Sequence, residues 1–337
     1  MRSRLLPLAL GGATVIALAL TGCSDGPGMT TSSDSANGAG NGSGAGAGTT
    51  SIQFVNPLPN YPAWRLIGDC MADAAEARGV DFNESGPTGQ AMDPTTMIEQ
   101  IQSAIANKKS GIITLPASDA FGPLLDQARD AGIVTATMYG DGADGSGADI
   151  NVGIDWTELG KIYVAEVEKL PGDKKLGLIA PGDTGIGKSF MDGVKAAVAD
   201  TDDVEIVGEV YTGDDSAKAL AQTNALLTAH PEVNVIATNM GTVTQGAVSA
   251  IEAKGLTGKV AFIGNGPDNG GKEALESGAE YRFLLQALCD AGADALDAVV
   301  DRIESGEAAG GSATLIDVGT RMATKDDYAE LLEQGWA

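Results

Sequence analysis

Short runs of apolar and β-branched residues alternate with longer amphipathic stretches from residue 51 onward. The first runs predict strands over 51–56, 80–84, 111–115 and 133–138. Between them, apolar positions recur at helical spacing and predict helices over 62–78, 94–108 and 120–131. The alternation is typical of a parallel sheet covered by helices.

The same rhythm starts again after a loop rich in Gly and Asp at 139–149. It predicts a second set of strands, over 175–180, 204–211, 233–238, 259–264 and 281–286. The matching helices are expected over 156–170, 188–199, 216–229, 242–254 and 289–305. Two such sets indicate two doubly wound α/β lobes, with a ligand cleft between the carboxyl ends of their strands.

Aspartates stand just before several of the predicted helices. Asp93 precedes Pro94, and Asp119 and Asp183 stand near the starts of two other helices. An aspartate at a helix start accepts hydrogen bonds from backbone N–H groups that have no partner inside the helix. We therefore expect these three aspartates to act as helix caps, with ligand contact in the cleft as the alternative for Asp119 and Asp183.

The first fifty residues differ in composition from the rest. Residues 1–22 combine two early arginines with an apolar stretch that is too short to favour a spanning helix, so they predict an export signal. The segment ends Leu-Thr-Gly-Cys23, which resembles a bacterial lipoprotein signal in which Cys23 is lipidated. Residues 23–51, mostly small and polar, predict a flexible linker. We expect a protein anchored by lipid outside the cytoplasmic membrane.

The charge balance and the residue counts argue against several function classes. The 337 residues include 46 acidic and 21 basic side chains, which gives a formal charge of −25. Nucleic-acid binding needs clustered Lys and Arg, so no nucleic-acid partner is expected. One histidine, His230, and three cysteines argue against a His/Cys zinc cage and against a triad with a second histidine. We expect no metal, no cofactor and no catalytic centre.

One motif favours a different function. The segment from Gly182 to Ser189 matches the Gly-x4-Gly-Lys-Ser pattern of a phosphate-binding loop, after a predicted strand and before a predicted helix. The later strands that end at Asn239 and Asn265 supply amides, not the aspartate that would hold magnesium. An exported protein would also meet little ATP. Nucleotide binding is therefore the weaker alternative.

The order of several short motifs resembles one family. The chain from 52 to 337 is similar to the periplasmic sugar-binding proteins of ABC importers, of the ribose- and galactose-binding type. The motifs are Asn60-Tyr-Pro-Ala-Trp64, Pro116-Ala-Ser-Asp119, Ala131-Gly-Ile133, Asp155, Leu226-Leu-Thr-Ala-His-Pro-Glu-Val233, Gly246-Ala247 and Gln286.

The resemblance implies two lobes joined by a three-strand hinge near Asp155, Gln286 and Ile316. The first lobe would comprise 52–154 plus 287–315, and the second 155–286 plus 316–337. It also implies a monomer that passes its ligand to the subunits of a membrane permease. Because the helices that carry Cys70 and Cys289 pack together in this family, a Cys70–Cys289 disulfide is expected, with two buried thiols as the alternative.

The resemblance also implies a set of ligand contacts in the cleft. They are Asn60, Tyr61, Trp64, Tyr139, Asp141, Asp155, Lys188, Asn239, Asp268 and Gln286. Trp64 also fits a core position, Asp155 also fits a helix cap, and Met240 competes with Asn239. Lys188 stands where sugar binders commonly have Arg, and a Lys cannot form the same bidentate fork.

We therefore expect a receptor that closes two lobes over a small polar ligand, a monosaccharide or polyol. Departures from the family at Tyr139, Lys188 and 265–269 also leave a sugar acid, a nucleoside or a signalling molecule open. A purely sensory receptor stays an alternative to a transport protein. A sugar-responsive transcription regulator would need an N-terminal helix-turn-helix, and residues 1–51 do not predict one.

Overall fold

The computed structural model describes residues 49–89, 91–140, 147–311 and 313–337. Residues 47–337 form one compact unit. Cys23, the signal, most of the linker and Asp141 lie outside the described residues. None of the helices within those ranges has the length and the apolar run needed to cross a bilayer.

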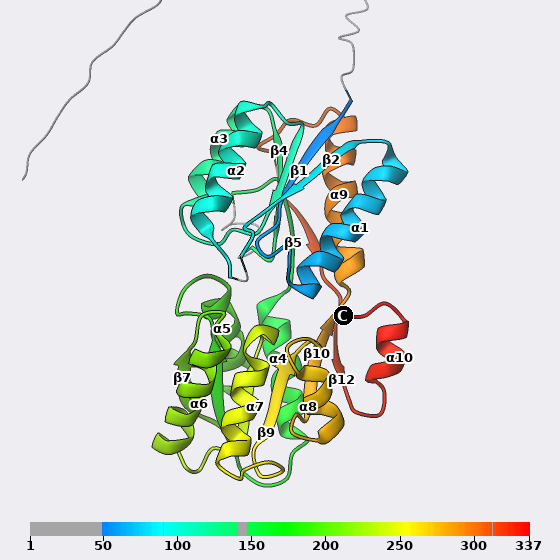
Figure 1. Ribbon diagram of the computed structural model, residues 1–337. Coiled ribbons are helices and arrows are strands. Elements are labelled where there is room, and N and C mark those ends of the chain that lie inside the picture. The colour runs from blue at the N-terminus through cyan, green and yellow to red at the C-terminus, as the bar shows by residue number, and fades with distance from the viewer. Residues whose placement is uncertain (1–48, 90, 141–146, 312) are drawn as a thin grey trace, which may run out of the picture. The chain divides into compact units, whose positions relative to one another are not determined.

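The first lobe is built on a parallel six-stranded sheet in the order β11-β5-β4-β3-β1-β2 (Figure 1). Its strands are β1 Ser51–Val55, β2 Asp81–Ser85, β3 Gly111–Thr114, β4 Val134–Met138, β5 Ile150–Gly153 and β11 Thr314–Asp317. Its helices are α1 Pro62–Arg78, α2 Pro94–Ala106, α3 Phe121–Asp130 and α9 Leu288–Glu304. Every residue of β3, β4 and β5 is buried, as expected for strands covered on both faces.

The second lobe repeats this plan in the order β12-β10-β9-β8-β6-β7, with only β12 antiparallel to its neighbour. Its strands are β6 Lys174–Ala180, β7 Val204–Tyr211, β8 Val235–Thr238, β9 Ala261–Asn265, β10 Arg282–Gln286 and β12 Thr320–Ala323. Its helices are α4 Trp156–Glu168, α5 Gly185–Val198, α6 Ser216–Ala229, η1 Gly241–Val243, α7 Thr244–Ala253, α8 Gly271–Ser277 and α10 Tyr328–Glu333. The two-lobed α/β fold predicted from the sequence is confirmed.

The chain passes between the two sheets at three places. It crosses from β5 to α4, from β10 to α9, and from β11 to β12. Near the second crossing, Gln286 and Ala337 exchange two backbone hydrogen bonds of 2.7 and 2.9 Å. The exact lobe boundaries, 52–154 plus 287–315 and 155–286 plus 316–337, remain predictions.

Several short elements were not anticipated from the sequence. They are β5, β11, β12, α8 and α10, each between four and seven residues long. Such segments are too short to show a hydrophobic period, and β11 leaves Leu315 62% exposed. The sequence pattern therefore gave no basis for assigning them.

The predicted helix caps were only partly correct. The Asp93 side chain accepts from the backbone N–H groups of Thr95 and Thr96, as predicted. The predictions for Asp119 and Asp183 are wrong, because the cap positions are Ala120 and Thr184 and neither makes a side-chain cap bond. Each of these helices starts at a different residue from the predicted one, so the aspartate lies outside the cap position.

Helices α1 and α9 pack closely in the first lobe. A Cβ on Gly292 would lie 2.6 Å from the Ile67 carbonyl oxygen, so this contact needs a glycine. The structure joins Cys70 to Cys289 by a disulfide with a Cα–Cα distance of 5.3 Å, as expected. Arg78, the last residue of α1, also forms ion pairs with three acidic residues in the second half of α9, namely Asp297, Asp301 and Glu304.

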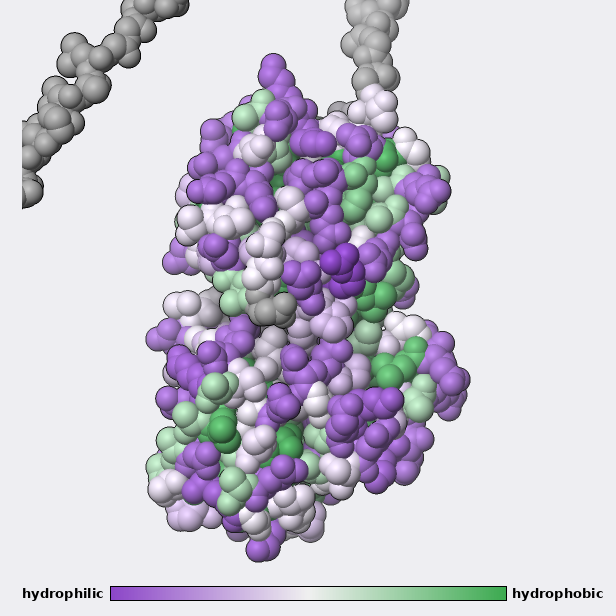
Figure 2. Space-filling view, viewed as in Figure 1, coloured by the Kyte–Doolittle hydropathy of each residue, from purple (hydrophilic) through white to green (hydrophobic). Residues whose placement is uncertain are grey.

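The surface in Figure 2 is dominated by hydrophilic side chains, and apolar residues form small, separate patches. Among the described residues, the exposed large apolar side chains are Tyr211, Leu220 and Leu315. Such scattered residues are normal on a soluble domain and do not mark an interface. These exposed apolar side chains therefore do not indicate a binding surface, and a cavity is the better candidate for the functional site.

Candidate functional site

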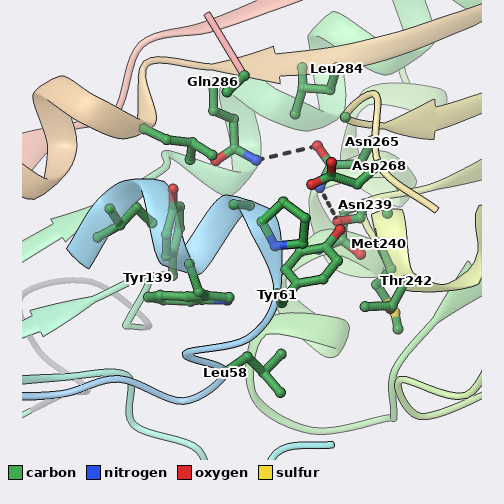
Figure 3. Close-up of a pocket in the computed structure, with 18 of the residues that line it drawn as sticks. Leu58, Tyr61, Tyr139, Asn239, Met240, Thr242, Asn265, Asp268, Leu284 and Gln286 are labelled. Carbon is green, nitrogen blue, oxygen red and sulfur yellow. Dashed lines mark hydrogen bonds between the residues drawn. The ribbon is translucent and has the colours of Figure 1, made fainter. Parts of the chain in front are cut away.

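A cavity of about 250 Å³ lies at the carboxyl ends of the strands of both sheets (Figure 3). The first lobe contributes mainly apolar side chains to it, among them Leu58, Pro62, Leu66, Ile67, Met92, Leu115 and Leu288. The second lobe contributes most of its polar side chains, namely Trp156, Asp214, Asn239, Thr242, Asn265, Asp268 and Gln286. This volume is slightly below the ~300–1,000 Å³ typical of ligand pockets, so it suits one small molecule.

Aromatic residues form one wall of this cavity. Trp64, in the first turn of α1, meets Tyr139 edge to face, with ring centroids 5.8 Å apart. Tyr139 follows β4 with a φ of 54°, in the left-handed region that a bulky residue seldom adopts. Strained backbone of this kind persists where the surroundings fix it, often at ligand sites. The ring of Tyr139 is thus held at the cavity at an energetic cost.

Tyr61 occupies the point of close approach between the lobes. It stands just before α1, and a Cβ on Gly241 would lie 2.7 Å from its hydroxyl oxygen. Burial raises the pKa of the Tyr61 hydroxyl above its usual value, and the negative charges of Asp268 and Asp214 add to the rise. Tyr61 therefore stays a neutral hydroxyl that both donates and accepts hydrogen bonds.

Two amide side chains are linked on the opposite wall. Asn265 Nδ2 donates to the backbone carbonyl of Asn239 at 2.7 Å, and Gln286 Nε2 donates to Asn265 Oδ1 at 3.3 Å (Figure 3). A carbonyl oxygen only accepts, so it fixes the orientation of the Asn265 amide, and Asn265 in turn orients Gln286. Gln286 Oε1 is therefore left as an acceptor on the cavity wall.

Two aspartates line the cavity from the second lobe. Asp214 follows β7, and its neighbour Asp215 caps α6 by accepting from the Lys218 backbone N–H. Burial raises the pKa of Asp214, and the neighbouring Thr242 hydroxyl opposes the rise. Burial also raises the pKa of Asp268, opposed by the backbone N–H of Ala63 in the first turn of α1. Each carboxylate is thus partly desolvated at the cavity wall.

Several buried polar atoms around the cavity lack a hydrogen-bond partner within the described part of the chain. They are Tyr139 Oη, Trp156 Nε1, Asn239 Oδ1, Thr242 Oγ1 and Gln286 Oε1. An unsatisfied buried polar atom costs about 1–3 kcal/mol. Atoms of this kind gathered around one cavity mark a ligand-binding site, because a ligand with complementary groups removes that cost.

The two-lobed fold with its site between the sheets agrees with a family match. The profile described as "Periplasmic binding protein domain" matches residues 52–308, about three quarters of the chain. The chain belongs to this family. No curated protein sequence matches this periplasmic binding protein.

Solved structures share the fold of this periplasmic binding protein at low sequence identity. GanP, a glucose-galactose binding protein from Geobacillus stearothermophilus, is 21% identical with a TM-score of 0.77, over 83% of this chain and 99% of its own. A carbohydrate transporter solute binding protein from Agrobacterium radiobacter is 20% identical with a TM-score of 0.75, over 86% and 99%. A periplasmic ribose ABC transporter from Conexibacter woesei is 22% identical with a TM-score of 0.72, over 87% and 97%.

The structure brings most of the predicted contacts of this periplasmic binding protein together at one cavity. Those on its wall are Tyr61, Trp64, Tyr139, Asn239, Asp268 and Gln286. Met240, the competitor of Asn239, also lines the cavity, so both positions face it. Trp64 both lines the cavity and packs on the core of its lobe.

Three predicted contacts do not lie on the cavity wall. Asn60 is exposed and donates to the Thr88 carbonyl oxygen at 3.2 Å. Asp155 is exposed and caps α4, accepting from two backbone N–H groups. Lys188 is exposed and pairs with Asp192 along α5. Asp141 lies outside the described residues.

The position of Lys188 also bears on the phosphate-loop match. Helix α5 begins at Gly185, three residues before the predicted start, which places Lys188 within the first turns of the helix. Its ammonium group pairs with Asp192, one turn further along, and Ser189 Oγ donates to the Gly185 carbonyl oxygen. The lysine is therefore directed along the helix and not over the preceding loop, which weighs against nucleotide binding.

Sequence reasoning missed Asp214 and Thr242 as cavity residues, and it named the loop 265–269 without assigning a contact to Asn265. Asp214 stands in an Asp-Asp pair before α6, and one member of such a pair is enough to cap the helix. Asp214, the member of the pair that does not cap the helix, stands after the carboxyl end of β7, and that position could have indicated a ligand contact. Thr242 lies in the short helix η1, at the start of the helix predicted over 242–254, where it was assigned to the helix and not to the cavity.

Proposed function

We propose that this periplasmic binding protein captures a small polar ligand, a monosaccharide or polyol, in the cavity between its lobes. The observation that carries the proposal is the set of buried, unpartnered polar atoms beside aromatic side chains in a cavity of about 250 Å³. Aromatic faces suit the C–H surfaces of a sugar ring, and the polar atoms suit its hydroxyls.

Both lobes line the cavity, so a ligand contacts both only when they are closed around it. Tyr61 and Trp64 come from the first lobe, and Asn239 and Asp268 come from the second. A ligand that gains contacts from both walls only in the closed state shifts the population toward that state. Hinge closure then needs no covalent chemistry, and we infer a binding protein and not an enzyme.

The next step is delivery of the ligand to an ABC permease. The similar structures support this, because their titles describe a glucose-galactose binding protein, a carbohydrate transporter protein with D-arabinose, and a ribose ABC transporter protein. Residues 1–22 would direct export, and lipid on Cys23 would hold the body outside the membrane through the linker 23–51. At about 5–6 Å times the square root of its length, that linker reaches on the order of 30 Å.

A sensory role is the second candidate. A similar structure is titled "XylFII-LytSN complex", with 20% identity and a TM-score of 0.72, so a protein of this fold is found bound to a second protein. In that role the closed state would be passed to a signalling partner. Ligand uptake by cells that lack the protein separates the roles, since loss of uptake supports transport and unchanged uptake supports sensing.

A thermal-shift screen of residues 47–337 against sugars, polyols, sugar acids and nucleosides tests ligand capture. A ligand at 100 times its Kd adds about 2.7 kcal/mol of stability and raises the Tm by several degrees. Asn239→Ala should lose most of this shift, while Asn107→Ala, an exposed residue at the end of α2, should keep it. A folded sample that shows no shift with any compound would contradict the proposal.

A further inference from the structure

The cavity carries negative charge without any positive partner. Asp214 and Asp268 line it, and no Lys, Arg or His is among the described residues of its wall. The segment 141–146, outside the described part, contains no basic residue in its sequence. Lys188, the predicted basic contact, pairs with Asp192 away from the cavity. An anionic ligand would therefore meet two carboxylates and no cationic side chain among the described residues of the wall.

The local partners of the two aspartates are neutral groups. Asp214 has the Thr242 hydroxyl, and Asp268 has the backbone N–H of Ala63 near the amino end of α1. A helix terminus and a hydroxyl stabilise a carboxylate, but they do not neutralise its charge. A cationic ligand group would supply the positive charge that the described cavity wall lacks, because buried charges are generally paired.

The cavity is also rich in hydrogen-bond acceptors. Gln286 Oε1 is fixed as an acceptor by the link through Asn265 to the Asn239 carbonyl, and Asn239 Oδ1 is a second unpartnered acceptor. With the two carboxylates, these acceptor groups outnumber the donor-only indole N–H groups of Trp64 and Trp156. The hydroxyls of Tyr139 and Thr242 can donate or accept. The wall therefore favours a ligand that donates more hydrogen bonds than it accepts.

Aromatic side chains complete the arrangement. Tyr61, Trp64, Tyr139 and Trp156 line the cavity, and Tyr139 is nine-tenths buried with an unpartnered hydroxyl. The negative faces of aromatic rings attract cations, most strongly where water is excluded. Carboxylates, acceptors and aromatic rings thus favour the same kind of ligand group.

We propose that the ligand is a hydroxylated small molecule carrying a protonated amine, such as an amino sugar, with the amine bound by Asp214 and Asp268. An ammonium group has three donors and no acceptor, which matches the acceptor-rich wall. This inference rests on the proposed capture of a polyol-type ligand and names its charge. It also disfavours the sugar acid that the sequence left open.

Calorimetric titration of residues 47–337 at pH 7 tests the inference with matched probes. Glucosamine, galactosamine and mannosamine are each compared with the parent hexose, with the N-acetyl derivative, which lacks the charge, and with the corresponding uronic acid. We expect at least one amine to bind ten or more times more tightly than its parent and its N-acetyl form. The uronic acids should show no binding.

Two isosteric variants locate the amine. Asp214→Asn and Asp268→Asn should each weaken binding of the amine at least tenfold while changing the affinity for the parent hexose much less. Asp200→Asn removes an exposed carboxylate beyond the end of α5 and should leave both affinities unchanged. Unchanged Tm values of the unliganded variants confirm that the fold is intact.

The outcomes separate this inference from the proposed function. Parent hexoses that bind as tightly as the amines, or uronic acids that bind at all, would overturn the inference and leave the proposed ligand capture standing. If no sugar binds in any form, the proposed function fails together with it. Equal losses for amine and parent in the two aspartate variants would also overturn the assignment of the amine.

Discussion

The two lobes present unlike walls to the same cavity. The first lobe contributes apolar and aromatic surface, and the polar side-chain groups that its described residues place there are the hydroxyls of Tyr61 and Tyr139 and the indole of Trp64. The second lobe contributes carboxylates and amides, among them Asp214, Asn239 and Gln286. The difference indicates a division of labour, because one wall provides contact area and the other determines which hydrogen-bonding groups fit.

The lobes also differ in how they accommodate a buried acid. In the first lobe Asp149 is fully buried, accepts from Thr135 and the Gly310 backbone N–H, and lies 3.9 Å from Arg302. In the second lobe Glu280, 2% exposed, lies against Gly264 at the end of β9, and no ion pair of Glu280 is found within the described residues. One lobe thus pairs its buried charge, and the other buries an acid that is easier to keep protonated.

The largest expected effect comes from the disulfide, which only the first lobe contains among the described residues. Replacing both Cys70 and Cys289 with Ala should lower the free energy of unfolding by about 2–5 kcal/mol. Chemical denaturation should then show the first lobe unfolding at lower denaturant than the second. Dithiothreitol should destabilise the wild type and leave the double variant unchanged, and two free thiols in non-reduced mass mapping would contradict the bond.

An intermediate effect is expected at the aromatic wall. Trp64→Ala removes contact area that every ligand in the cavity shares, so it should weaken every ligand that binds, by roughly 2–4 kcal/mol as for a binding hot spot. Calorimetry with a neutral sugar and an amine should show similar losses for both. A loss confined to one of them would contradict the assignment of contact area to this wall, and Trp64→Phe should recover part of the affinity.

The smallest effect is a pH dependence in the second lobe. Burial raises the pKa of Glu280 well above its ordinary value of 4.5, while the Gly264 backbone opposes the rise. The folded state therefore keeps this proton to higher pH than the unfolded chain does, and stability falls as pH rises above that ordinary value. The charged groups near Glu280 are three lysines, Lys174, Lys259 and Lys325, which line a second cavity with it. Lys174 is paired with Asp203, and none of the three counters the effect of burial on the pKa of Glu280.

The substitution Glu280→Gln tests this sign. The variant should match the wild type near pH 5 and gain stability relative to it as pH rises to 8, measured by denaturation at each pH. Glu273→Gln, an exposed acid on α8, serves as the control and should show no such trend. A difference that stays constant across this range would show that Glu280 does not carry the effect.

Much of the fold follows from the sequence, because long segments with a regular hydrophobic period predict their own secondary structure. The predicted bounds of α1, β7 and α6 match the structure, since each has a complete hydrophobic pattern between clear end signals. The short strands β5, β11 and β12 show no period and take their conformation from pairing with neighbours distant in the chain. The equally short β3 and β8 were predicted because each is a continuous buried run, whereas tertiary contacts determine the conformation of β5, β11 and β12.

The cavity residues that could be predicted from the sequence are those that stand at or just after the end of a strand. Tyr139, Asn239 and Gln286 follow or end strands, so the topology alone brings them to one edge. Lys188 lies off the cavity wall because α5 begins three residues earlier than expected, which places it about 4.5 Å further along the helix axis from the start of α5, where it pairs with Asp192. Their contacts with a ligand remain predictions.

The link from Asn239 through Asn265 to Gln286 has a consequence for specificity. The first member of this chain is a main-chain carbonyl, which no side-chain substitution at position 239 removes. The backbone thus dictates the polarity that the last side chain shows to a guest molecule. A near-isosteric aspartate in place of Asn265 would still accept from Gln286 Nε2 but would set a carboxylate oxygen against the Asn239 carbonyl, so it would break the link at its main-chain end. Recognition in this receptor is therefore encoded partly by main-chain atoms and not by side-chain identity alone.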